Sequence, residues 1–139
     1  MRNVILIVSV LCITLTNCSK SSPSPSPPIP LVGTWSLLSI KDSIFTADII
    51  PAPFTVSISF SGNKVSGRTR VNQYFGDYTL VPSSEINMAV GSTFVFDLTY
   101  NVLEAKYLNS LSKVKFYHIN KDTLTLSNDG LLKINYLKK

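Results

Sequence analysis

The side chains that most often carry out catalysis are sparse in this chain. His118 is the only histidine, and a general base needs a positioned partner to act. His118 ends an alternating segment on the same predicted face as Val114 and Phe116, so we interpret it as a structural residue. The 8 carboxylates are scattered, no two are spaced for local pairing, and turn chemistry explains most of them.

Cys18 is the residue with the clearest chemistry. It follows an apolar run from Val4 to Leu15 with Arg2 in front, and that run is shorter than the roughly 20 residues needed to cross a bilayer core. Leu15-Thr16-Asn17-Cys18 resembles a bacterial lipobox, with Asn17 where Gly, Ala or Ser is usual. We therefore predict a lipoprotein signal peptide over residues 1–17 and lipidation of Cys18. The alternative is an ordinary secretory signal, for which Thr16-Asn17 is a poor cleavage site.

This prediction removes both cysteines from the thiol chemistry of the mature protein. Cys12 would leave with the signal peptide and the Cys18 sulfur would become a thioether, so no cysteine remains for a disulfide, a zinc site or a nucleophile. The sequence also lacks a nucleophile-elbow serine and a Gly-rich loop between strand and helix. We expect no catalytic, metal or cofactor site, and therefore not an enzyme.

Residues 18–30 are predicted to be a lipidated tether. They are rich in serine and proline, which favours an extended, solvated chain with partial polyproline II geometry. At about 3 Å per residue the segment would hold a domain some tens of ångströms from the bilayer. A Pro-rich ligand for a binding module is the alternative interpretation.

Residues 31–139 have the size of one domain, and most of them alternate with the period of a β-strand. Apolar residues alternate with serine and threonine over 54–60, Gly62-Asn63 follows as a hairpin turn, and the return strand carries Val65, Gly67, Thr69 and Val71 inward. Further alternating segments end on Tyr78-Leu80, Met88-Val90, Leu124-Leu126 and Ile134-Tyr136.

One segment has a helical period instead. Its apolar stripe, which leaves Glu104, Lys106 and Asn109 outside it, is Phe96, Tyr100, Leu103, Tyr107 and Leu111. Ser92 or Thr93 is the expected helix cap. The sequence therefore predicts an α+β domain: a curled, nearly closed antiparallel β-sheet of about eight short strands, with one helix inserted before the last three strands.

In their order and spacing, several segments are similar to the META domain, the module of heat-shock lipoproteins of the HslJ type. The segments are Leu31-Val-Gly-Thr-Trp35, Gly67 to Tyr78 with Asn72 and Tyr74-Phe75-Gly76, Met88-Ala89, Glu104 with Tyr107 and Leu111, Val114-Lys-Phe-Tyr117, and Asp122 to Leu126 with Asp129-Gly130. The resemblance covers nearly all of residues 31–137. It implies an envelope protein linked in some members to heat or antibiotic stress, with no catalysis and no agreed ligand.

The chain departs from the family at two positions. Members often carry cysteines where this chain has Val71 and Val90. The resemblance therefore implies that these valines are neighbours in the core, and the absence of both cysteines argues against a redox role for this chain.

Basic residues give one candidate binding surface. Strand parity places Lys64, Arg68 and Arg70 on one outward face, where they would meet an anionic envelope component such as lipid headgroups, lipopolysaccharide phosphate or peptidoglycan carboxylate. The alternative is that these charges only keep a strand soluble and guard its edge from pairing. The net charge of +5 is mild, and the envelope location excludes nucleic acid.

Trp35 and the Tyr74-Phe75-Gly76 block have two interpretations. In the first, Trp35 plugs one end of a filled sheet and Gly76 permits a backbone turn. In the second, these aromatic residues line the cavity of a lipocalin-like carrier of a small hydrophobic ligand. We favour the filled core. The function predicted from the sequence is thus a non-enzymatic, lipid-anchored envelope protein, at the periplasmic face of the outer membrane, serving envelope integrity or stress tolerance.

Overall fold

The computed structural model describes residues 31–42, 55–82, 84–95, 97 and 100–139. Within these ranges the chain forms eight strands and one helix, as the alternating and helical periods predict. The elements are β1 (Gly33–Lys41), β2 (Ser57–Ser61), β3 (Lys64–Arg68), β4 (Gln73–Val81), β5 (Glu85–Ser92), α1 (Asn101–Leu111), β6 (Phe116–Asn120), β7 (Thr123–Ser127) and β8 (Lys133–Lys138).

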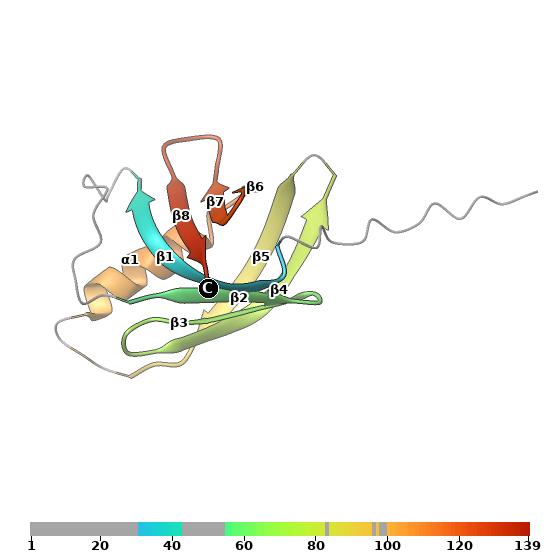
Figure 1. Cartoon of the computed structure of the whole chain (residues 1–139). Helices are drawn as coiled ribbons and strands as arrows, with labels where there is room; N and C mark the ends of the chain where they lie inside the picture. The colour runs from blue at the N-terminus through green and yellow to red at the C-terminus, as the bar shows by residue number, and fades with distance from the viewer. Residues whose placement is uncertain (1–30, 43–54, 83, 96, 98–99) are drawn as a thin grey trace, which may run out of the picture.

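The strands form a closed antiparallel barrel in which each strand pairs with its neighbours in sequence (Figure 1). β1 closes the ring against β8, from Trp35 opposite Lys138 to Lys41 opposite Lys133. The shortest strand pairing in the barrel is between β5 and β6, which share the single register pair Glu85 and Phe116. The predicted α+β fold with a curled antiparallel sheet is therefore confirmed.

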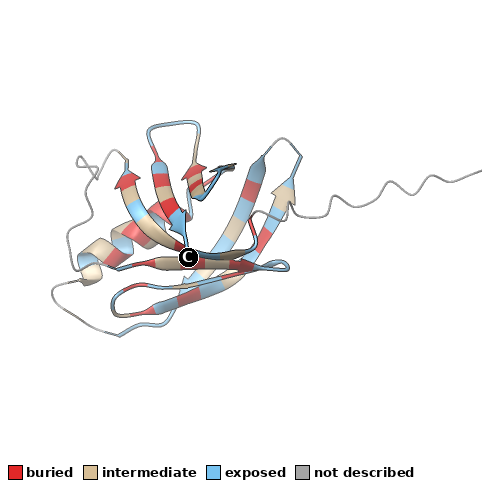
Figure 2. Cartoon of the chain, in the orientation of Figure 1, coloured by how far each residue is buried: buried red, intermediate tan, exposed pale blue. Residues whose placement is uncertain are grey.

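Burial alternates along the strands, as Figure 2 shows by its bands of red and blue. Inward side chains from the strands and from α1 fill the barrel, with those of β6 only partly buried against the core. The largest fully buried ones are Trp35, Tyr74, Tyr107, Tyr136 and Phe60. Removing apolar surface from water contributes roughly 25 cal/mol per Å². The described residues include no cysteine, so this burial is the main source of their stability.

Two local irregularities fit the sequence. Gly62 has a φ of 59°, and with Asn63 it makes the tight β2–β3 turn between the paired residues Ser61 and Lys64, as predicted. In β1 the register against β8 shifts between Leu37 and Ser39. The side chain of Leu38 is therefore 57% exposed.

The helix begins later than predicted. Ser92 is the last residue of β5, and Tyr100 precedes the first helical residue without a side-chain cap, so the predicted cap at Ser92 or Thr93 is wrong. Instead Asp97 supports the helix start, because its carboxylate accepts a hydrogen bond from the backbone N–H of Tyr100 at 3.1 Å. Thr93 extends the pairing of β5 with β4, because its backbone N–H donates a hydrogen bond to the Gln73 carbonyl oxygen at 2.9 Å.

The buried face of α1 is also rotated from the predicted stripe. Tyr107 and Leu111 are buried as expected, but Glu104, predicted to lie outside the stripe, is buried with them. Apolar periodicity cannot place a carboxylate in the interior, because its burial depends on polar partners elsewhere in the chain.

Strand β6 has the opposite parity from the one predicted. Tyr117 and Ile119 pair with the inward residues Leu126 and Leu124, whereas His118 is exposed. The error arises because Val114 precedes the strand, which begins at Phe116. Extrapolating the alternation from Val114 therefore shifts every side chain to the wrong face.

The predicted core neighbours Val71 and Val90 are both only half-buried. Val90 packs against the core and lies opposite Gly76 in β4. Val71 lies before β4, in a turn closed by a hydrogen bond of 2.8 Å from Thr69 N to Asn72 O. The two valines are thus not cross-strand neighbours, and the inference of a buried pair is wrong.

The predicted signal peptide, the lipidation site Cys18, the tether, Phe54 and Phe96 lie outside the described residues. Among the residues that are described, no helix is long and apolar enough to span a membrane.

Candidate functional site

A chain of three tyrosine hydroxyls crosses the interior of the barrel. The Tyr107 hydroxyl, on α1, lies 2.8 Å from that of Tyr74 on β4 and 2.9 Å from that of Tyr136 on β8. Tyr74 donates onward to the backbone carbonyl oxygen of Ser57 at 2.8 Å. The helix is therefore tied to two separate strands through the barrel interior, with each buried hydroxyl satisfied.

Burial determines the protonation of these tyrosines. Desolvation raises the pKa of Tyr74, Tyr107 and Tyr136 well above the usual value of 10.0, because a phenolate would lose its hydration in the core. All three are neutral donors and acceptors at physiological pH. The arrangement is a structural polar network and not an acid–base pair poised near neutrality.

Trp35 occupies the interior in the way the filled-core interpretation predicts. Its side chain is fully buried, its indole N–H donates to the carbonyl oxygen of Leu31 at 3.0 Å, and the ammonium of Lys138 lies 5.4 Å from the ring centroid. Trp35, Tyr74, Tyr107 and Tyr136 line none of three well-formed surface hollows in the described part of the chain. The predicted end plug is thus part of a packed core.

A second polar cluster lies where α1 meets the start of β4. The buried carboxylate of Glu104 accepts one hydrogen bond from the Thr69 hydroxyl and another, at 2.9 Å, from the Asn72 side-chain amide. The Asn72 side-chain oxygen in turn accepts from the Val95 backbone N–H at 2.7 Å and from the Thr93 hydroxyl at 3.1 Å. This cluster fixes the turn 69–72 against the helix and against the segment after β5.

The turn 69–72 borders a hollow on the outer wall of the barrel, with a volume of about 490 Å³. Its centre is a row of side chains across three strands, because Ser36 pairs with Ser57 and Ser57 pairs with Arg68. The hydroxyl residues Thr55 and Thr69 and the apolar Leu37 complete much of its lining. It is the best candidate for a functional site in the described residues.

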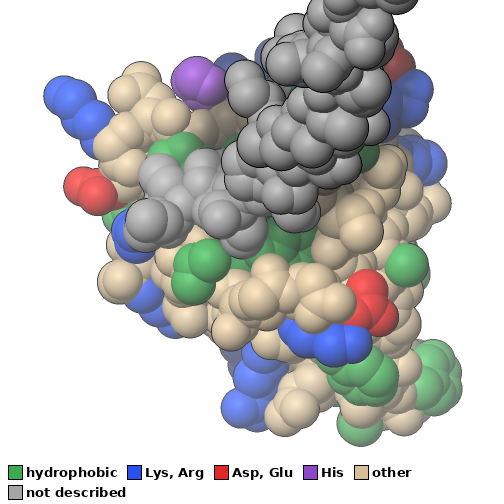
Figure 3. All heavy atoms as spheres, turned by 90° about the vertical axis from the view of Figure 1, so that its right-hand side faces the viewer, with side chains coloured by type: hydrophobic (Ala, Val, Ile, Leu, Met, Phe, Trp, Pro, Cys, Tyr) green, Lys and Arg blue, Asp and Glu red, His purple; other side chains and the backbone are tan. Residues whose placement is uncertain are grey.

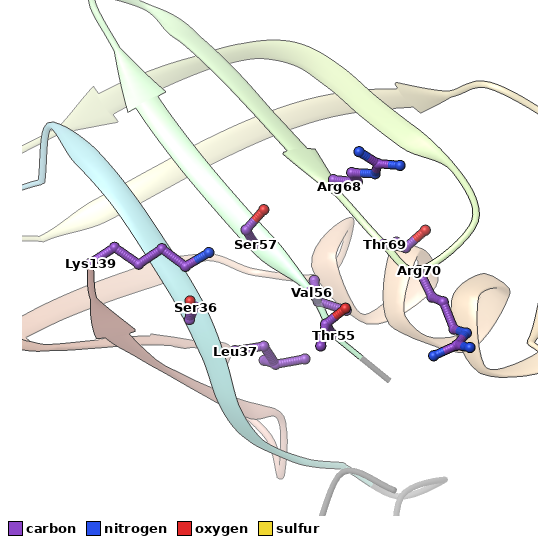
Figure 4. A pocket seen from close by; sticks show the side chains of 9 residues that line it. All are labelled: Ser36, Leu37, Thr55, Val56, Ser57, Arg68, Thr69, Arg70 and Lys139. Atoms are coloured by element: carbon purple, nitrogen blue, oxygen red, sulfur yellow. The ribbon is translucent and has the colours of Figure 1, made fainter. Parts of the chain in front are cut away.

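Three cationic side chains surround this hollow, and no Asp or Glu among the described residues lines it. Figure 4 shows Lys139 on one side, reaching over β1, and Arg68 and Arg70 on the other side. Neither the Arg68 nor the Lys139 side chain has an ion-pair or hydrogen-bond partner among the described residues. The Arg70 guanidinium lies 4.6 Å from the Tyr100 ring centroid, a cation–π contact that orients it.

The structure changes the basic set predicted from the sequence. Lys64 is exposed at the other end of β3 and forms an ion pair with Asp77 at 2.5 Å, so it does not join Arg68 and Arg70. Lys139, which follows β8, takes its place at the hollow. On the face that Figure 3 shows, basic side chains stand at several separate places.

The other polar side chains considered as functional candidates do not form a site among the described residues. His118 is exposed on the outer face of β6, opposite Thr125, and the described residues contain no group of three or more His, Cys, Asp or Glu side chains able to hold a metal ion. The Tyr78 hydroxyl is buried without a hydrogen-bond partner among the described residues.

The model of the META domain matches residues 30–137. The chain belongs to the META domain family. No curated protein matches it. The resemblance inferred from the Asn72 to Tyr78 block and its flanking segments is therefore confirmed.

Three solved structures share the fold of this META domain. An NMR structure of a protein from Burkholderia xenovorans has a TM-score of 0.65 at 19% identity, covering 86% of this chain and 96% of that one. A crystal structure of a DUF4847 family protein from Bacteroides vulgatus ATCC 8482 has a TM-score of 0.60 at 14% identity, covering 80% and 95%. A further NMR structure has a TM-score of 0.55 at 17% identity, covering 78% and 90%.

The residues of the central block serve the fold of the META domain. Asn72 joins the turn to α1, Tyr74 belongs to the hydroxyl chain, and Tyr78 packs edge-on against Phe60 with ring centroids 5.1 Å apart. Gly76 lies within β4 and not in the predicted turn, at a point where a Cβ atom would come 1.8 Å from Ala89 O. Phe75 is the exception, with 60% of its side chain exposed.

Proposed function

We propose that this META domain protein is a lipid-anchored, non-enzymatic component of the bacterial cell envelope. It would be attached through Cys18 to the periplasmic face of the outer membrane and serve envelope integrity or stress tolerance through contacts made by the outside of its barrel. The observation that carries this proposal is the filled interior. Trp35, Tyr74, Tyr107 and Tyr136 are each at most 1% exposed, which leaves the outer surface for recognition.

The anchor rests on the sequence. Leu15-Thr16-Asn17-Cys18 follows an apolar run of signal-peptide length, and Ser19-Lys20 lacks the aspartate that in some bacteria signals retention in the inner membrane. The proline- and serine-rich residues 18–30 would give the domain reach from the bilayer.

The rival function is a lipocalin-like carrier of a small hydrophobic ligand. Such a carrier needs an apolar cavity of some 300–1,000 Å³, and an eight-stranded barrel is just wide enough either to hold one small ligand or to be filled by side chains. The packing of Trp35, Tyr74, Tyr107 and Tyr136 inside this barrel favours an interior filled by side chains.

The test of the anchor is Cys18→Ser in the producing bacterium, followed by separation of membrane and soluble fractions. Each buried acyl methylene contributes about 0.8 kcal/mol to membrane binding, so the variant should leave the membrane or persist as an unprocessed precursor. The matched control is Cys12→Ser, which changes a thiol inside the apolar run and should leave attachment intact. Equal membrane association and equal electrophoretic mobility of Cys18→Ser and wild type would refute the anchor.

A further inference from the structure

The hollow beside the turn 69–72 has the composition of a binding site for a negatively charged ligand. Arg68 and Arg70 stand on one side and Lys139 on the other, and the described part of the lining contains no Asp or Glu side chain. Guanidinium groups bind phosphate oxygens through pairs of N–H donors, and an ammonium group adds a point charge. Cations on two sides suit a ligand that extends across the hollow, with negative charge near at least one end.

The middle of the hollow suits a different chemistry. Ser36, Thr55 and Ser57 carry hydroxyls that donate and accept hydrogen bonds, and Leu37 adds a half-buried apolar surface beside them. A sugar ring presents both kinds of surface, with hydroxyls at its edge and C–H groups on its faces. The volume of about 490 Å³ lies in the range of small-molecule sites.

We propose that this hollow binds a phosphorylated sugar, with Arg68 as the principal phosphate ligand, Lys139 as the cationic contact at the opposite end of the ligand, and Ser36 and Ser57 as hydrogen-bond partners of the sugar. This inference deepens the proposed function, because it supplies the chemical class of the envelope component that the outside of the barrel would contact.

The surrounding structure holds the cations in place. Arg68 ends β3 and is paired in register with Gln73 of β4. Arg70 follows in a turn that is tied to α1 by the hydrogen bonds from Thr69 and Asn72 to Glu104. The backbone at Arg68 and Arg70 is thus held by strand pairing and by buried hydrogen bonds, which limits the ordering entropy that a ligand must overcome.

The experiment is an NMR titration of the ¹⁵N-labelled mature chain, carrying Cys18→Ser to keep it in solution. The three probes are glucose 1-phosphate, glucose and inorganic phosphate. We expect glucose 1-phosphate to give saturable shifts of the backbone amides of Ser36, Ser57 and Arg68, with a dissociation constant on the order of 1 mM. Inorganic phosphate should bind about tenfold more weakly, because it lacks the sugar contacts, and glucose should not saturate the site.

Two variants and one control test the residues. Arg68→Gln and Lys139→Gln should each weaken glucose 1-phosphate binding about tenfold, because each removes one charge-assisted contact. Lys64→Gln removes a cation from the far end of β3 and should leave the affinity unchanged. The melting temperature of each variant shows whether its fold is intact, and all three positions are exposed.

Three results would overturn the inference. They are the absence of saturable shifts with glucose 1-phosphate, an affinity loss in Lys64→Gln equal to that in Arg68→Gln, or binding of inorganic phosphate as tight as that of the sugar phosphate. The last result would leave a simple anion site. None of these outcomes bears on the anchor, because the titration uses a chain without Cys18 and the fractionation experiment uses no ligand.

Discussion

Asn72 donates its side-chain amide to the carboxylate of Glu104 across a distance of 2.9 Å, and both residues are about 96% buried. They lie 32 residues apart in the chain, Asn72 immediately before β4 and Glu104 in the first turn of α1. A buried carboxylate is tolerated only where hydrogen bonds replace its lost hydration. This contact, with that from Thr69, is therefore what allows α1 to pack with a charged side chain in its buried face.

Removal of the Glu104 carboxylate should destabilise the domain. In Glu104→Ala the buried donors of Thr69 and Asn72 lose an acceptor, which costs about 1–3 kcal/mol, and the urea midpoint should fall accordingly. Asn109→Ala, at an exposed position of the same helix, is the control and should stay within about 0.5 kcal/mol of wild type. Equal midpoints for the two variants would show that the buried contact is not used for stability.

The hydroxyl chain predicts an ordering among tyrosine variants. Tyr107→Phe should cost about 1–3 kcal/mol, because it leaves the buried hydroxyl of Tyr136 without a partner. Tyr78→Phe removes a buried hydroxyl that has no partner in the described residues, so it should be neutral or stabilising. Chemical denaturation of both variants checks the order, and a larger loss in Tyr78→Phe would contradict it.

Alkaline pH should weaken the fold. The folded-state pKa values of Tyr74, Tyr107 and Tyr136 are raised above 10.0 by burial, so the unfolded chain loses these protons first. Their contribution to stability is complete below pH 10 and is lost as pH rises through 10 toward the folded-state values. The free energy of unfolding, measured by urea at pH 8 to 11, should decline above about pH 10, and less steeply in Tyr136→Phe. A profile that is flat over this range would contradict the assignment of three buried, neutral phenols.

Two glycines give a matched pair of alanine substitutions. Gly76→Ala would place a Cβ atom 1.8 Å from the carbonyl oxygen of Ala89, whereas at Gly91 the same atom meets nothing within 4 Å. Because the first clash is with backbone, Gly76→Ala should cost about 3 kcal/mol. Gly91→Ala should change stability by at most about 0.5 kcal/mol. Thermal melts of the two variants compare them directly, and similar melting temperatures would argue against the tight β4–β5 approach.

Alternation of side chains made most of the sheet predictable. The hairpin from Ser57 to Arg68 and the inward residues of β7 and β8 follow from a period of two, because one face of each strand must be buried. The inward and outward faces of β6 were predicted the wrong way round. Val114 is buried, but it lies two residues before the strand begins and does not belong to its alternation. A single-residue shift of that kind is invisible when only the local pattern is considered.

The polar contacts were harder to predict. Glu104 is buried through Thr69 and Asn72, partners more than 30 residues away, and no local signal marks such a pairing. Arg68 and Arg70 were identified from strand parity. Lys139 joined them only through the closure of β8 on β1, and Lys64 was removed from the set by its ion pair with Asp77.

The most direct test of the account is native mass spectrometry of the protein extracted from bacterial membranes in detergent. The central claim is a barrel that is anchored by acylation of Cys18 and filled by its own side chains. It predicts a chain that begins at Cys18, carries the mass of a covalent lipid and releases no hydrophobic small molecule on activation. A chain without the acyl mass, or one that retains a stoichiometric apolar ligand, would contradict it.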